Sequence, residues 1–151
     1  MSPSLNAFKV IYDTDPGVDD AIALYFALAH PAIDLVGITT TFGNVTVDQA
    51  ATNALYLTAL AGHPVPVTRG VHKPWVKPGE APPAHIHGGD GLGNLPARTT
   101  TTSPLDPRPS ARFIVDMARA HPGEITLVAV GPLGNLALAL QLEPALPLLL
   151  R

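Results

Sequence analysis

The sequence contains no cysteine, and this absence narrows the chemistry open to it. Disulfide bonds, thiolate metal sites and cysteine nucleophiles are all excluded. Any metal ion must therefore be bound by oxygen or imidazole ligands. Charge is also scarce, since 14% of the residues are charged and the net charge is −3. No basic surface is expected to attract nucleic acid or anionic lipid, so the predicted partner is a small molecule.

Long apolar runs are missing as well. No run reaches the roughly 18 residues needed to span a bilayer. Residues 1–9 also lack the basic region and apolar stretch of a secretion signal. We therefore expect no membrane partner and a cytoplasmic, reducing location. The hydrophobic content of 46% is enough for one compact domain with a buried core.

Short apolar, β-prone runs alternate with segments of helical spacing along the chain. We predict strands at residues 8–12, 33–39, 65–67 and 125–130, and helices at residues 19–29, 47–61, 111–120 and from 131 onward. This alternation predicts a three-layer α/β fold, with a mainly parallel sheet and helices on both faces. Residues 69–109 are predicted to form a long loop, and residues 143–151 to open a further helix.

Three of the predicted helices carry more specific expectations. Apolar residues lie nearly all round residues 19–29, so this helix is expected to be buried on several sides. Ser110 is expected to cap the helix at residues 111–120. Asn135 is expected to serve the turn that opens the last helix at Gly131 and Pro132. The predicted core face of that helix consists of Leu133, Leu136, Ala137 and Leu140.

Acidic residues crowd together directly after the first predicted strand, at Asp13, Asp15, Asp19 and Asp20. Ligands of parallel sheets bind at this end of the strands. Crowded like charges raise the cost of folding unless a cation or strong hydrogen bonds compensate them, and an all-oxygen site suits calcium or magnesium. The alternative is that the carboxylates cap a turn and a helix N-terminus, which accounts for only two of them. An EF-hand loop starting at Asp13 is excluded, because Leu24 occupies its twelfth position.

Four segments resemble known enzyme motifs. Residues 13–21 (Asp-Thr-Asp-Pro-Gly-Val-Asp-Asp-Ala) closely resemble the N-terminal signature of the inosine-uridine preferring nucleoside hydrolase family. Further matches follow in the family's order at residues 41–44, 87–93 and 130–137, so the resemblance spans nearly the whole chain. It implies a Rossmann-like nucleoside hydrolase fold. A weaker resemblance is to haloacid dehalogenase-like phosphatases, which share a strand-end Asp-x-Asp but usually place Thr or Val where Gly17 stands.

The family resemblance implies a role for each matching residue. Calcium would be bound by the carboxylates of Asp15 and Asp20 and by the backbone carbonyl of Val130. Asp15 would also be the base that activates a water molecule at the ion. Asp19 and Asn44 would bind the ribose hydroxyls.

Two further residues complete the implied site. Asp13 would support the metal and ribose ligands from behind. His87 matches a histidine that lies near the leaving base in some family members, and imidazole can donate a proton near neutral pH. The alternative of a loop histidine without a catalytic role stays open.

The implied function is that of a calcium-dependent nucleoside hydrolase. Such an enzyme cleaves the N-glycosidic bond of purine or pyrimidine ribonucleosides to base and ribose, in nucleoside catabolism or salvage. Family enzymes are longer, so residues 1–151 would be the N-terminal part of a single domain whose C-terminal half is absent. Full-length relatives are expected to be homo-oligomers. The alternative function is a catalytically inactive fragment that serves as a binding or interaction domain.

Overall fold

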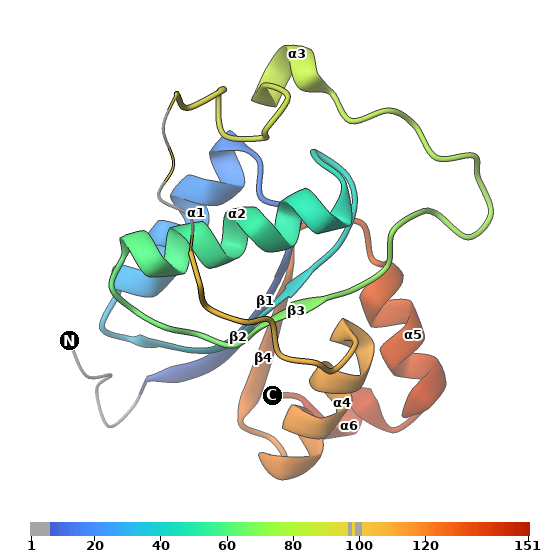
Figure 1. The fold of residues 1–151 in the computed structure, drawn as a ribbon. Coiled ribbons are helices and arrows are strands. Elements are labelled where there is room, and N and C mark those ends of the chain that lie inside the picture. The colour runs from blue at the N-terminus through green and yellow to red at the C-terminus, as the bar shows by residue number, and fades with distance from the viewer. Residues whose placement is uncertain (1–6, 97, 99–100) are drawn as a thin grey trace.

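The computed structural model describes residues 7–96, 98 and 101–151. Within them, parallel strands form one sheet in the order β3-β2-β1-β4, namely β1 (Phe8–Thr14), β2 (Ile33–Thr40), β3 (Val67–Arg69) and β4 (Ile125–Ala129). The helices are α1 (Val18–Ala29), α2 (Val47–Leu60), α3 (Ala84–His87), α4 (Ser110–Ala120), α5 (Gly134–Leu142) and α6 (Leu146–Leu149). Helices cover both faces of the sheet (Figure 1), so the predicted three-layer α/β fold is confirmed.

Two apolar cores lie on opposite faces of the sheet, because successive residues of a strand point to opposite sides. Val10 of β1 packs with Leu24 of α1 and Leu57 of α2 on one face. Its neighbour Ile11 packs with Phe113 of α4 on the other face, where α5 and α6 also contribute. Both faces are therefore closed by helices, as expected of a parallel sheet.

Several borders differ from the sequence prediction. β3 pairs with β2 at residues 67–69 instead of 65–67, because Pro66 has no backbone N–H to give to a strand partner. Ser110 does not cap α4 but is its first residue. Its buried hydroxyl lies 2.8 Å from the hydroxyl oxygen of Thr68. The predicted long loop contains the short helix α3. The further helix predicted to open within residues 143–151 is present as the short helix α6.

The predicted core face of the last helix is confirmed only in part, since Leu136 packs against the core but two of the other predicted residues do not. Helix α5 begins at Gly134, and Leu133 and Leu140 are 56% and 37% exposed. Asn135 and Ala139 are instead the residues of α5 that are fully buried. The amide of Asn135 is hydrogen-bonded inside the molecule, and this tie orients the helix.

Helix α1 is less buried than its composition predicts. Ile22 and Phe26 are 70% and 60% exposed, and the buried side chains are confined to one face. An apolar groove of about 660 Å³ lies beside them, between α1 and strand β4. β4 is an edge strand of the sheet, so nothing in the described part of the chain covers this side of α1.

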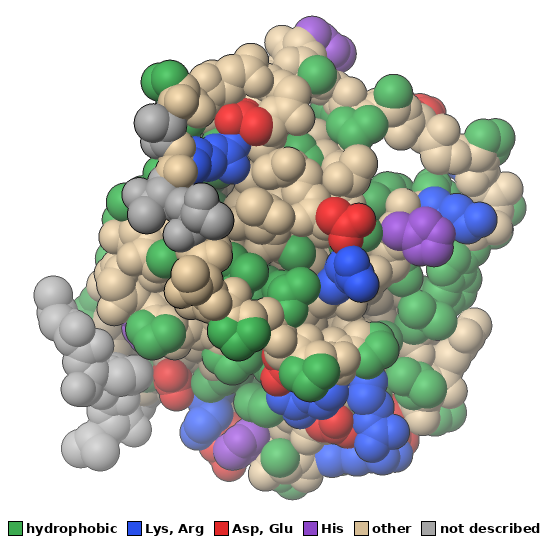
Figure 2. Space-filling model, viewed as in Figure 1, with side chains coloured by type: hydrophobic (Ala, Val, Ile, Leu, Met, Phe, Trp, Pro, Cys, Tyr) green, Lys and Arg blue, Asp and Glu red, His purple; other side chains and the backbone are tan. Residues whose placement is uncertain are grey.

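The face shown in Figure 2 carries basic and acidic side chains next to one another over α4. Arg108 and Arg112 both pair with Asp116, and Arg119 pairs with Glu143. The positive charges over this helix are therefore balanced locally. No helix in the described residues has the length and apolar character required to cross a bilayer.

Replacing Gly37 of β2 with alanine is expected to destabilise the fold. An added Cβ would overlap the ring of Phe113, which is 1% exposed and has no free space into which to turn. Overpacking of this kind costs about 1–3 kcal/mol. Chemical denaturation measures it, and Gly79→Ala is the matched control because its added Cβ meets nothing closer than 3.8 Å. Equal stability of the two variants would contradict the packing described here.

Candidate active site

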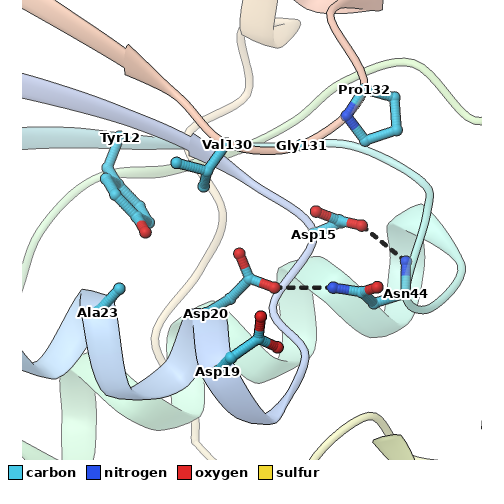
Figure 3. A pocket seen from close by; sticks show the side chains of 9 residues that line it. All are labelled: Tyr12, Asp15, Asp19, Asp20, Ala23, Asn44, Val130, Gly131 and Pro132. Atoms are coloured by element: carbon cyan, nitrogen blue, oxygen red, sulfur yellow. Dashed lines mark hydrogen bonds between the residues drawn. The ribbon is translucent and has the colours of Figure 1, made fainter. Parts of the chain in front are cut away.

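The carboxyl ends of β1, β2 and β4 meet at one edge of the sheet. Asp13 pairs in register with Thr39 of β2 and with Ala129 of β4, so the turns that follow these strands lie close together. They enclose a pocket of about 480 Å³, shown in Figure 3. Its lining residues are Tyr12, Asp15, Asp19, Asp20, Ala23, Asn44, Val130, Gly131 and Pro132.

Asp15 follows β1 directly, and its carboxylate is only 5% exposed. Its Oδ2 accepts a hydrogen bond of 2.6 Å from the backbone N–H of Asn44. Gly43 and Gly131 allow the backbone to pass close to this group, since a Cβ at Gly131 would lie 2.8 Å from Oδ1. Burial raises the pKa of Asp15 to about 6. The N–H of Asn44 opposes this rise, whereas the charge of Asp20 adds to it.

Asp20 lies in the first turn of α1 and is held from three sides. Its Oδ2 accepts from the backbone N–H of Gly17 at 3.2 Å and from Nδ2 of Asn44 at 2.7 Å, and its Oδ1 accepts from the hydroxyl of Thr14 at 3.2 Å. The bond to Gly17 is an N-terminal cap of the helix, as the capping alternative predicts. The bond to Asn44 links α1 to the turn after β2, so Asp20 also joins two walls of the pocket.

Asp19 and Tyr12 differ strongly in exposure although both line the pocket. The side chain of Asp19 is 83% exposed and is available to a ligand. Tyr12 is 6% exposed. Burial, together with the charges of Asp20, Asp19 and Asp15, raises the pKa of Tyr12 to about 12. The tyrosine therefore stays neutral and can act only as a hydrogen-bonding group at the pocket wall.

Asp13 lies behind the pocket and is almost completely buried. Its Oδ2 accepts from the hydroxyl of Thr39 at 2.5 Å and from Nδ2 of Asn135 at 2.8 Å. Burial raises the pKa of Asp13 to about 6, and these two donors oppose the rise. Asn135 also donates to the carbonyl of Thr40 and accepts from the N–H of Val71, so it joins β1, β2 and the loop after β3.

His87 ends α3 and contacts the N-terminus of α1. Its Nδ1 accepts a hydrogen bond of 3.3 Å from the backbone N–H of Val18 and lies 3.7 Å from Oδ1 of Asp19. A neutral ring with Nδ1 as acceptor carries its proton on Nε2. Gly17 permits this approach, because an added Cβ would lie 2.7 Å from Nδ1 of His87. His87 is therefore placed beside the pocket and does not line it.

The donor groups of the pocket fit a hard divalent cation. Two buried carboxylates, Asp15 and Asp20, repel each other, and the available donors are all oxygen atoms. One oxygen of Asp13 and the hydroxyl of Thr41 are buried without a hydrogen-bond partner nearby. Three or more acidic or imidazole side chains do not cluster as metal ligands anywhere in the described residues, so water and backbone oxygens would have to complete the shell.

The sequence model described as inosine-uridine preferring nucleoside hydrolase matches residues 10–151. This chain belongs to that family. The resemblance predicted from the motifs is confirmed. The family match covers every residue that lines the pocket.

Named relatives of the family are similar to the chain along most of its length. It is 46% identical over 138 residues to a probable uridine nucleosidase 2 of Arabidopsis thaliana. The aligned region covers 90% of this chain and 42% of the relative. The chain is 41% identical over 138 residues to the inosine-uridine preferring nucleoside hydrolase of Leishmania major, with 90% and 44% covered. The chain thus spans less than half the length of these relatives.

Solved structures of the family have the same fold. The plant nucleoside hydrolase PpNRh1 superimposes with a TM-score of 0.87 at 39% identity, over 95% of this chain and 45% of that one. A purine-preferring ribonucleoside hydrolase from Gardnerella vaginalis gives a TM-score of 0.89 at 36% identity, over 94% and 46%. The predicted nucleoside hydrolase fold is therefore confirmed for the part of the domain that this chain represents.

Most of the predicted site residues come together in the pocket of this family member. Those that line it are Asp15, Asp19, Asp20, Asn44 and Val130. Asp13 lies behind it and His87 beside it, and the roles of all seven residues stay predictions. Sequence reasoning missed Tyr12, which reads as an ordinary strand residue, and the tie from Asn135 to Asp13. A polar residue at a core position of the last helix was the available signal for Asn135.

Replacing Asn135 with alanine is expected to destabilise the protein. The change leaves the buried groups of Asp13, Thr40 and Val71 without a partner. Each unsatisfied buried group costs about 1–3 kcal/mol. Gln141→Ala is the matched control, because it truncates an exposed amide on the same helix. If denaturation midpoints of the two variants agreed, the tie would contribute nothing to stability.

Proposed function

We propose that this chain supplies the sugar-binding and water-activating part of a nucleoside hydrolase. The enzyme would cleave the N-glycosidic bond of a purine or pyrimidine ribonucleoside to give the free base and ribose. The observation that carries the proposal is the meeting of buried Asp15 and Asp20 with Asn44 and exposed Asp19 in one pocket. The uridine nucleosidase and nucleoside hydrolase names of the relatives support the same activity.

A calcium ion is proposed to be held by the carboxylates of Asp15 and Asp20 and by the backbone carbonyl of Val130. When bound, such an ion lowers the pKa of water and places positive charge beside the reacting sugar. Two adjacent buried carboxylates support this assignment, because their repulsion is relieved by a divalent cation. All the donors are hard oxygen atoms, which calcium prefers.

Asp15 is proposed as the general base. Its raised pKa of about 6 keeps the carboxylate ionised at neutral pH and makes it more basic than an exposed aspartate. It takes a proton from the attacking water, whose oxygen forms the new bond to the anomeric carbon of the ribose. The bond from that carbon to the base nitrogen breaks, and its electron pair leaves with the nitrogen. The N–H of Asn44 fixes the carboxylate in place during this transfer.

The remaining residues are proposed to orient the two ends of the substrate. Asp19 and Asn44 bind ribose hydroxyls. Asp13 lies behind the pocket and supports these ligands from the end of β1. His87 in its imidazolium form donates from Nε2 the proton that the departing base nitrogen needs. In that form Nδ1 also carries a hydrogen, which would face Oδ1 of Asp19, 3.7 Å away, instead of accepting from Val18. The contact between His87 and Asp19 supports this role, because it places the imidazole next to the proposed sugar site.

We further propose that residues 1–151 are the N-terminal part of a single nucleoside hydrolase domain. The relatives extend well beyond the region matched here, since the chain covers 42–46% of them. Other parts of such a domain would supply the further metal and ribose ligands that two carboxylates cannot provide alone.

Asp15→Asn is expected to abolish ribose release from uridine and inosine in a protein that carries the whole family domain. Loss of a general base costs roughly 10²–10⁴-fold in rate. Asp48→Asn is the control, because Asp48 is an exposed aspartate on α2 away from the pocket. Release of reducing sugar is the measurement. Activity of Asp15→Asn within a few-fold of the control would exclude Asp15 as the base, and the same assay on residues 1–151 alone tests the inactive-fragment alternative.

Removal of calcium is expected to lower the thermal stability of the protein, and Asp20→Asn to remove that dependence. An ion that binds only the folded state stabilises it by RT ln(1 + L/Kd), where L is the free calcium concentration, so the melting temperature rises with the calcium concentration. The measurement is the shift in melting temperature when calcium is added to chelated protein. Asp48→Asn should shift as the unmodified protein does. If calcium did not shift the melting temperature of the unmodified protein, the proposed calcium site would be excluded. The activity of Asp15→Asn would still test Asp15 as the general base.

A further inference from the structure

Asn53 of α2 is a fully buried polar side chain that lies outside the pocket. It is 0% exposed, and neither the metal ligands nor the ribose ligands proposed above include it. A buried amide is costly unless its hydrogen bonds are satisfied. Its partners therefore indicate why the position is polar.

The side-chain amide of Asn53 uses its full hydrogen-bonding capacity. Nδ2 donates to the carbonyl of Pro16 and to the carbonyl of Asp90, both at 3.0 Å. Oδ1 accepts from Nε2 of Gln49 at 2.9 Å and from the guanidinium of Arg98 at 2.6 Å. An amide has two donor hydrogens and two acceptor lone pairs, so none is left for a ligand. Asn53 is thus a connecting residue and does not bind substrate.

The partners of Asn53 belong to the two halves of the candidate site. Pro16 is the residue after Asp15, in the turn that carries the proposed base. Asp90 lies three positions after His87, in the segment that carries the proposed proton donor. One side chain therefore fixes the carbonyls of both segments to α2.

The backbone after His87 is shaped to approach Asn53 closely. Gly91 has a φ of +79°, and a Cβ there would lie 2.9 Å from Nδ2 of Asn53 and 3.1 Å from the carbonyl oxygen of Pro16. Only glycine accommodates both the backbone angle and the close contact. The segment therefore contacts Asn53 through its backbone, without an intervening side chain.

Asp90 and Arg98 hold the same segment together internally. The carboxylate of Asp90 accepts from the N–H groups of Leu92, Asn94 and Leu95, and it pairs with Arg98. Burial would raise the pKa of Asp90, but the N–H groups of Leu92 and Asn94 and the guanidinium of Arg98 outweigh it and lower the pKa to about 2. The segment is thus a stable unit, and Asn53 attaches it to α2, while His87 attaches it to the start of α1.

We propose that Asn53 is a positioning residue that holds the His87 segment in register with the Asp15 turn, so that proton donation to the leaving base depends on it. The proposal rests on the proposed function in assigning proton donation to His87. It predicts that loss of Asn53 harms the departure of poor leaving groups selectively. Base activation by Asp15 should be affected less, because the N–H of Asn44 also holds that carboxylate.

The test compares two substrates of the full-length protein that differ in their need for a proton donor. Inosine needs protonation of the leaving nitrogen, whereas 4-nitrophenyl β-D-ribofuranoside releases a stable phenolate without it. Asn53→Ala is expected to lower kcat/KM for inosine by about tenfold, part of the roughly 10²–10⁴-fold that a proton donor contributes. The nitrophenyl riboside should lose less than about threefold on the same scale.

Controls and a double mutant make the result specific. Thr52→Ala changes an exposed neighbour on α2 and should leave both substrates unaffected. Asn53→Ala combined with His87→Ala should be no slower on inosine than His87→Ala alone, because residues that act through one another are not additive. If Asn53→Ala fails to fold, Arg98→Ala is the second variant. It removes one donor to Oδ1 of Asn53 together with the ion pair to Asp90, and it should give a weaker effect of the same kind. Equal losses on both substrates, or additive effects, would overturn the proposal.

A measurement without substrate separates this proposal from the proposed function. Hydrogen–deuterium exchange of residues 88–95 should be faster in Asn53→Ala than in Thr52→Ala, while exchange in β1 and β4 stays the same. Unchanged exchange in residues 88–95 would overturn the attachment, whatever the activity. If the unmodified protein released no ribose from either substrate, the proposed function would fail. The assignment of proton donation to His87 would fail with it. The exchange result would still decide whether Asn53 attaches residues 88–95.

Discussion

The burial of several carboxylates at the ends of parallel strands is the constraint on which this structure depends. Asp13, Asp15 and Asp20 are each at most 8% exposed, and burial raises the pKa of Asp13 and of Asp15. Each one is therefore surrounded by donors taken from other elements: the hydroxyls of Thr39 and Thr14, and N–H groups of Asn44. These donors hold the turns after β1 and β2 together. The hydrogen bonds that the buried carboxylates need therefore also shape the pocket.

The same constraint explains residues that have no functional group of their own. Glycine is required wherever backbone must pass beside a buried carboxylate or a ring, as at Gly131 beside Asp15 and at Gly17 beside His87. Larger residues would push these groups apart and leave buried charge without partners, which is more costly than the flexibility that glycine introduces. These two glycines are thus a geometric consequence of the carboxylate and the imidazole ring beside them.

The fold and most of the candidate pocket could be predicted because their signals are local. Strand and helix periodicity gave the layers, and Asp15, Asp19 and Asp20 lie within one turn that ends a strand. The partners of Asn135 and Asn53 could not be predicted, because they lie far away in sequence. Asn135 reaches Asp13 across 122 positions, and Asn53 reaches Asp90 across 37. The exposed face of α1 was missed for a related reason, since composition does not report which neighbours cover a helix.

The proposed sugar end and the proposed base end of the site lie on separate segments, and this separation bears on specificity. The acidic turn is held by the sheet, whereas His87 belongs to a segment that docks on α2 through Asn53. Relatives whose names specify uridine and relatives whose names specify purines both match this chain along most of its length. Similarity in this region therefore does not distinguish the bases. A proposed sugar site held by the sheet and a separately docked segment would let the base end vary with little effect on the buried carboxylates, because the described hydrogen bonds that join the two run through the side chains of Asn53 and His87.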